Sequence, residues 1–236
     1  MPSKSKTKNW DWQVRYTVIL MCCAATFICY IDRVNISVAI IPMAEQYNWD
    51  LQTQGTVLSS FYVGYLLMQV MGGFLADRFG GKIVLGMGVL LWSFFTIVTP
   101  WAALSGMLGL LVARVCMGLG EAVTFPSVYS LVSRWFPSNE TAKAVALNAS
   151  GIPIGTVFAL LLTPIIVEQL GWEWAFYLFG LLGVAWYIAW TLTVTTNPED
   201  HPKISTDELL YIRANAPAQG KINTPPIGAF LRNKAV

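Results

Sequence analysis

Charged residues are scarce in this chain. Only 12% of its 236 residues are Asp, Glu, Lys or Arg, whereas 55% are hydrophobic. Soluble domains carry about 25% charged residues, so this balance is typical of membrane proteins. The net charge of +2 is too small to indicate a nucleic-acid partner. We therefore expect a protein whose surroundings are a lipid bilayer and that binds no nucleic acid.

Histidine and cysteine are also rare. His201, the one histidine, follows the apolar segments, so proton transfer inside the membrane is left to carboxylates. We find no nucleophile–base pair and no phosphate-binding loop, and we predict no metal, no cofactor and no enzymatic activity. The cysteines all lie in apolar segments without metal-ligand spacing, which favours a packing role. They are Cys22, Cys23, Cys29 and Cys116.

Six apolar stretches are each long enough to cross a bilayer as a helix, which takes about 20 residues. Backbone groups in lipid must bond within the segment, so helices are favoured over open sheets. We predict an all-α membrane protein with a tail at 1–13, a six-helix bundle at 14–195 and a linker at 196–236. The predicted spans are Val14–Pro42, Gln52–Ala76, Ile83–Trp101, Ser105–Val132, Ala144–Val167 and Trp174–Thr195.

Basic residues outside these stretches fall in alternate connections. They precede the first stretch, separate the second from the third and the fourth from the fifth, and follow the sixth. The other connections contain acidic residues instead. Because lysine and arginine accumulate on the cytoplasmic side, we predict that both termini are cytoplasmic. Short tails, and outer loops without a glycosylation sequence, favour a bacterial inner membrane over a eukaryotic one.

The linker has its own local signals. Residues 205–208 read Ser-Thr-Asp-Glu, the spacing of a capping box, and predict a short helix that ends near Ala214. Proline and glycine then indicate an irregular segment, and residues 227–236 resemble the approach to a further helix. Within the fifth apolar stretch, Gly151 and Gly155 have the spacing of a close helix contact.

Four charges interrupt the apolar stretches, and we call them the membrane charges: Asp32, Arg33, Arg114 and Glu121. Each would cost roughly 2.5–3.5 kcal/mol if left unpaired at the centre of a membrane helix. Arg114 and Glu121 share one helix face, about 10.5 Å apart, and can line one cavity wall. A guanidinium suits an anion, and a carboxylate can carry a proton. Alternatively, the four charges neutralise one another and lock the first helix to the fourth.

Two resemblances sharpen this interpretation. Residues 73–82 read GFLADRFGGK and resemble the signature loop of the major facilitator superfamily, G-x-x-x-D-R-x-G-R-[RK], with glycine in place of arginine at position 81. In that family the loop between helices 2 and 3 helps to latch the closed state on the cytoplasmic side. The resemblance implies that the latch residues are Gly73, Asp77, Arg78 and Gly80, with Arg134 as a partner.

A narrower resemblance covers nearly the whole chain. Residues 30–39 (YIDRVNISVA), 59–65 (SSFYVGY), 114–121 (RVCMGLGE) and 135–137 (WFP) are similar to the anion:cation symporters, although Thr141 stands where arginine is common. Bacterial members of this type import sugar acids with protons. The resemblance implies substrate contacts from Arg33, Arg114, Tyr30, Tyr65, Asn148 and Ser150, and proton coupling by Asp32 and Glu121.

Members of this family have about twelve helices in two halves, each built from inverted three-helix units. This chain resembles the N-terminal half. We therefore expect secondary transport of an organic anion, such as a hexonate, hexuronate or glucarate, coupled to protons by alternating access. The half would act as a fragment of a longer carrier, as one part of a split carrier, or as a self-pairing unit. A non-transporting membrane partner and a drug-efflux carrier are the other hypotheses.

Overall fold

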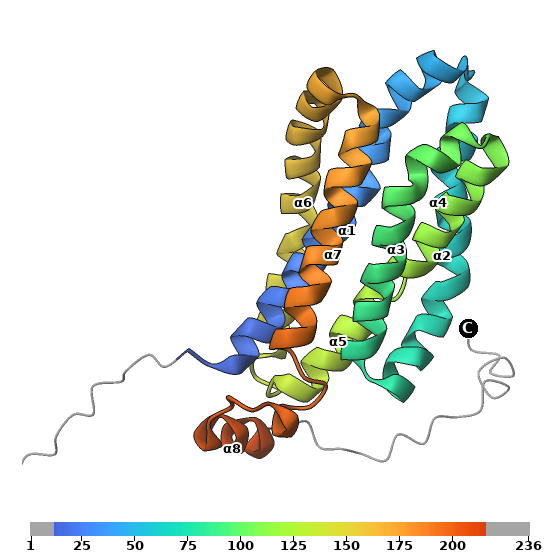
Figure 1. Ribbon diagram of the computed structural model, residues 1–236. Helices are drawn as coiled ribbons and strands as arrows, with labels where there is room; N and C mark the ends of the chain where they lie inside the picture. Colours follow the sequence, from blue (N-terminus) through green and yellow to red (C-terminus); the bar gives the residue numbers. More distant parts are fainter. Residues whose placement is uncertain (1–11, 216–236) are drawn as a thin grey trace, which may run out of the picture.

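The computed structural model describes residues 12–215, and the regular structure within that range is helical (Figure 1). Six of its helical spans are long and apolar enough to cross a membrane. The predicted all-α membrane fold is therefore confirmed. The helices are α1 (Val14–Tyr47), α2 (Leu51–Phe79), α3 (Gly81–Leu104), α4 (Met107–Glu121), α5 (Thr124–Trp135), α6 (Thr141–Leu170), α7 (Trp172–Thr193), the 3-10 turn η1 (Pro198–Asp200) and α8 (Thr206–Ala214).

The fourth span was predicted as one continuous helix, and this was wrong at one point. α4 ends at Glu121 and α5 begins at Thr124, so the span is interrupted at residues 122–123. Pro126 supplies the physical reason, because proline has no N–H for the carbonyl four residues earlier and its ring crowds that carbonyl. The interruption directly follows Glu121, one of the membrane charges.

The helices form two groups that lie side by side in Figure 1, with α1, α6 and α7 in one group and α2, α3, α4 and α5 in the other. Close contact between α1 and α6 depends on the two glycines predicted to pack there. A Cβ added to Gly151 would lie 2.6 Å from the carbonyl oxygen of Cys23, and one added to Gly155 would meet the backbone of Phe27. Small residues let backbones approach in this way.

The short helix α8 begins as the sequence predicts. The Ser205 hydroxyl accepts a hydrogen bond from the Glu208 backbone N–H at 3.1 Å. The Glu208 carboxylate, however, accepts from the backbone N–H groups of Val14 and Arg15, each at 3.0 Å. Because the start of a helix carries unpaired N–H groups and positive charge, this carboxylate caps α1. The linker helix is thereby attached to the bundle.

Arg15 lies at the centre of this attachment, with only 3% of its side chain exposed. Its guanidinium contacts Glu140 in the α5–α6 connection at 3.0 Å and Glu208 on α8 at 3.5 Å. The Tyr211 hydroxyl also donates to Glu140, at 3.1 Å. We call Arg15, Glu140, Glu208 and Tyr211 the Arg15 cluster. It was not predicted, since its members lie 125 and 193 positions apart in the sequence.

The N-terminal tail up to residue 11, the irregular segment after residue 215 and the predicted approach to a further helix lie outside the described residues.

Removing the Glu208 carboxylate will destabilise the bundle. Glu208→Ala removes one of the two carboxylates that contact Arg15 and leaves the first turn of α1 without its cap, and loss of one member of a buried ion pair costs about 3–5 kcal/mol. Thermal unfolding of the purified protein in detergent micelles measures this loss. Glu199→Ala is the control, because Glu199 pairs with Arg213 at 3.1 Å on an exposed surface and should contribute about 0–1 kcal/mol. Equal effects of both substitutions would contradict a structural role for the cluster.

Candidate functional site

Two of the membrane charges, Arg33 on α1 and Glu121 on α4, form an ion pair. Arg33 Nη2 and Nε donate to Glu121 Oε2 at 2.8 Å and 3.1 Å. The Cys29 thiol donates to the same oxygen at 3.2 Å. The other carboxylate oxygen, Oε1, is buried and has no hydrogen-bond partner within residues 12–215. Three donors therefore converge on one oxygen of a carboxylate that is fully removed from solvent.

Aromatic rings surround the Arg33 guanidinium. Its central carbon lies 4.9 Å from the ring centre of Tyr30, 5.1 Å from that of Phe61 and 4.9 Å from that of Tyr65. Ring faces attract a guanidinium, and the attraction strengthens where water is excluded. Tyr30 and Tyr65, which the resemblance implies as substrate contacts, both lie beside Arg33. Their contact with a substrate stays a prediction.

Phe61 was not predicted, although it contacts both arginines. The Arg114 guanidinium lies 5.2 Å from its ring centre, on the ring that also contacts Arg33. Phe61 precedes Tyr65 by one helical turn, so both face the same side of α2. That spacing was the available signal in the sequence. One ring therefore joins the two cationic groups of the site.

Arg114 and Asp32 differ from the ion-paired residues. Arg114 is 2% exposed, and its guanidinium donates to the sulfur of Met117 at 3.7 Å. Asp32 is 1% exposed, and neither of its oxygens has a hydrogen-bond partner in the described chain. Among the described residues, Arg33 and Glu121 thus form a hydrogen-bonded ion pair, whereas Arg114 and Asp32 have no such pair. A buried guanidinium with unused donors can bind an anion.

Asn148 and Ser150, the polar residues predicted as substrate contacts on the fifth membrane span, form hydrogen bonds with other groups of the protein. Asn148 is 1% exposed and accepts a hydrogen bond from the Thr26 hydroxyl on α1 at 3.0 Å. Ser150 donates to the carbonyl oxygen of Leu147 at 2.6 Å. Neither side chain has a hydrogen bond to Arg33 or Arg114 in the part of the chain described. Their proposed contact with substrate hydroxyls stays a prediction.

The predicted latch residues lie at the end of α2. Asp77 and Arg78 are exposed, and Gly80 precedes α3 with a φ of +87°, a conformation that favours glycine. Arg134 donates to the Asn197 side chain at 2.9 Å rather than to Asp77, so the expected pair is absent among residues 12–215. Gly73 lies beside open space, since a Cβ added there would have no atom within 4 Å. The latch itself stays a prediction.

Glycines hold α2 against α4 and thereby position Phe61 and Tyr65. A Cβ on Gly64 would meet the carbonyl oxygen of Val115, and one on Gly118 would meet that of Phe61. Each glycine therefore faces the backbone of the other helix. This contact brings the aromatic residues of α2 to the arginines on α1 and α4.

A family model described as Major Facilitator Superfamily matches residues 22–236. The chain belongs to this superfamily. The all-α architecture with six candidate spans agrees with the N-terminal six-helix bundle of such a protein. The family consists of transporters rather than enzymes.

Two curated relatives come from Arabidopsis thaliana. The chain is 42% identical to a chloroplastic ascorbate transporter over 212 residues, which is 90% of this chain and 39% of that protein. It is 41% identical to the chloroplastic sodium-dependent phosphate transport protein 1 over 226 residues, which is 95% of this chain and 44% of that protein. The chain thus spans about two fifths of the length of these relatives.

Solved structures share the fold at low sequence identity. A bacterial homologue of the lysosomal transporter Spinster, inward-facing and occupied, has a TM-score of 0.71 and 22% identity over 82% of this chain and 47% of its own. The inward-open xylose transporter of E. coli has a TM-score of 0.70 and 15% identity, over 78% of this chain and 49% of its own. Each likeness covers about half of the larger protein.

Adding one methyl group at Gly118 will separate α2 from α4. Gly118→Ala places a Cβ against the backbone of Phe61 and 2.8 Å from the Tyr65 nitrogen, and overpacking of this kind costs about 1–3 kcal/mol. The control is Gly55→Ala on α2, where no atom lies within 4 Å and alanine should stabilise a helix by up to about 1 kcal/mol. Thermal unfolding compares them, and equal stability of both variants would contradict the close approach.

Proposed function

We propose that this chain is half of a secondary active carrier that moves a small organic anion, such as a sugar acid, together with protons. The observation that carries the proposal is Arg114, a buried guanidinium without an ion-pair partner in the described chain. Charged residues within membrane spans mark solute or ion pathways by default. A second guanidinium, Arg33, contacts the same Phe61 ring.

The contacts give each membrane charge a role. Arg114 receives the carboxylate of the solute, because its Nε has no partner among the described residues and its Nη1 donates only to the Met117 sulfur. Arg33 becomes a second donor when Glu121 takes up a proton, since protonation removes the charge that holds the guanidinium. Asp32 is the second carboxylate proposed to carry a proton. Binding of the anion and protonation of Glu121 would thus favour each other, which is the coupling that a symporter needs.

The relatives support an anionic solute. One is named for ascorbate and another for phosphate with sodium dependence, so sodium is the competing hypothesis for the coupling ion. Their names place them in the chloroplast. We retain the bacterial inner membrane, with both termini cytoplasmic, as the proposed location, on the basis of the basic connections and of outer loops without a glycosylation sequence.

The complete carrier would need a second six-helix half, because the chain spans about two fifths of the relatives' length. This half would come from the same longer protein, from a separate chain or from a second copy. The same observation favours the alternative that the chain by itself is a non-transporting membrane partner.

Arg114→Ala will abolish anion binding. The full chain in liposomes, alone and together with a candidate second half, is tested with a panel of labelled sugar acids. Equilibrium binding and uptake driven by an inward proton gradient are both measured. Arg213→Ala, which changes an exposed arginine on α8, should behave as the unaltered protein. Unchanged binding in Arg114→Ala would contradict the assigned site, and binding without uptake would favour the non-transporting alternative.

Glu121→Gln will leave anion binding intact but make anion accumulation independent of the proton gradient. The amide resembles the protonated carboxyl, so Arg33 is free and the anion still binds and exchanges. Accumulation should no longer rise as the outside pH is lowered. Uptake at several outside pH values measures this, with Glu168→Gln at an exposed position as the control. A pH dependence equal to that of the unaltered protein would exclude Glu121 as the proton carrier, and a response to sodium instead would favour sodium coupling.

A further inference from the structure

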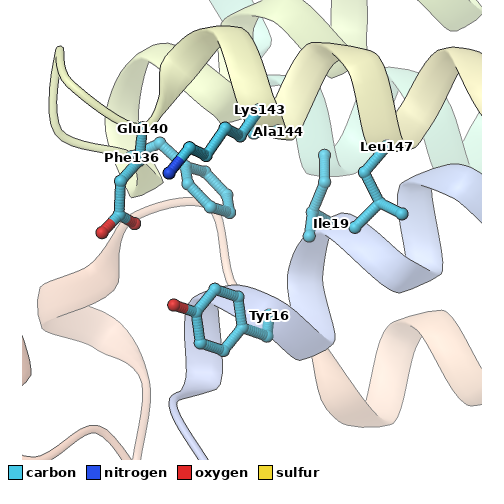
Figure 2. Close-up of a pocket in the computed structure, with 7 residues that line it drawn as sticks. All are labelled: Tyr16, Ile19, Phe136, Glu140, Lys143, Ala144 and Leu147. Carbon is cyan, nitrogen blue, oxygen red and sulfur yellow. The ribbon is translucent and has the colours of Figure 1, made fainter.

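A pocket of about 140 Å³ lies between α1 and α6 at the α8 end of the bundle (Figure 2). Tyr16 and Ile19 line it from α1, and Lys143 and Leu147 line it from α6. Phe136 and Glu140 close one end. Since liquid water takes about 30 Å³ per molecule, there is room for roughly four or five heavy atoms the size of a water oxygen. No role described above involves this pocket.

The pocket has a polar side and an apolar side. Figure 2 shows the Lys143 ammonium, the Glu140 carboxylate and the Tyr16 hydroxyl toward one side, and Ile19 and Leu147 toward the other. Glu140 is paired with Arg15, which donates to both of its oxygens at 3.0 Å and 3.3 Å and also contacts Glu208. Lys143 is exposed and has no ion pair within residues 12–215. Lys143 is therefore the unpaired cation among the described side chains that line the pocket.

The pocket lies at the level expected for lipid headgroups. It opens beside the first turns of α1, where Tyr16 contacts the ring of Trp12, which is 63% exposed. Tryptophan and tyrosine gather at the boundary between membrane and water, and basic residues gather on the cytoplasmic side of it. Beyond the pocket, Leu20 and Leu147 remain 43% and 39% exposed along α1 and α6. An apolar path thus leads from the pocket toward the bilayer.

We infer that this pocket binds the headgroup of an anionic phospholipid. Its phosphate would contact Lys143 and Tyr16, and its first apolar segment would lie against Ile19 and Leu147. Basic pockets between membrane helices on the cytoplasmic side recognise such headgroups through the same combination of charge and apolar contact. Free inorganic phosphate shares the charge but would leave the apolar side uncovered. The lipid would lie beside Glu140, and so beside the Arg15 cluster that attaches α8.

Binding of purified lipids to the full chain tests this inference without any measurement of transport. The protein in detergent micelles is titrated with short-chain phosphatidylglycerol, short-chain phosphatidylcholine and inorganic phosphate, and the melting temperature is followed. Phosphatidylglycerol should raise it, and the other two should not. Lys143→Gln should weaken the apparent affinity for phosphatidylglycerol about fivefold, from the contribution of one lysine near a charged lipid surface.

Two further variants test whether lipid binding depends on this pocket or on the positive charge of the surface in general. Lys143→Arg keeps the cation and should retain binding. Lys203→Gln removes an exposed lysine that does not line the pocket and should bind as the unaltered protein does. Equal effects of phosphatidylcholine and phosphatidylglycerol, equal effects of free phosphate, or full binding by Lys143→Gln would each overturn the inference.

Discussion

The cost of placing a charge where no water can reach it governs this structure. In the hydrocarbon region, an ionised side chain must find its partners within the protein. Arg33 finds them in Glu121 and in three aromatic rings. Phe61 and Tyr65 reach Arg33 from α2, and Gly64 and Gly118 let α2 pack closely against α4. The packing of small residues and the placement of charges are therefore two parts of one arrangement, and neither explains the site alone.

Much of the architecture could be predicted from the sequence because bilayer thickness fixes the length of an apolar helix. The same holds for local signals. Ser205 caps α8 as its spacing with Glu208 indicates, and Gly151 packs against α1. The membrane charges were recognised because each interrupts a long apolar run. What these features share is that a few neighbouring residues determine them.

Features that depend on distant partners could not be predicted in this way. Phe61 is one of many aromatic residues in the sequence, and only the packing of α2 against α4 brings it to both arginines. The break before Thr124 follows from Pro126, but prolines elsewhere, such as Pro153, remain within a continuous helix. The Arg15 cluster joins residues separated by 193 positions. These features are determined by tertiary contacts rather than by the conformational preferences of neighbouring residues.

Two buried arginines show how the number of partners determines what the same side chain can do. Arg15 has two carboxylates, and the ring of Tyr211 lies 5.1 Å from its guanidinium. Its ion pairs are with other parts of the protein, so Arg15 holds α1, the α5–α6 connection and α8 together. Arg114 is equally buried, but a thioether and an aromatic ring are poor substitutes for a carboxylate. A bound anion would supply the acceptor that Arg114 lacks, which is why we propose that the solute binds there.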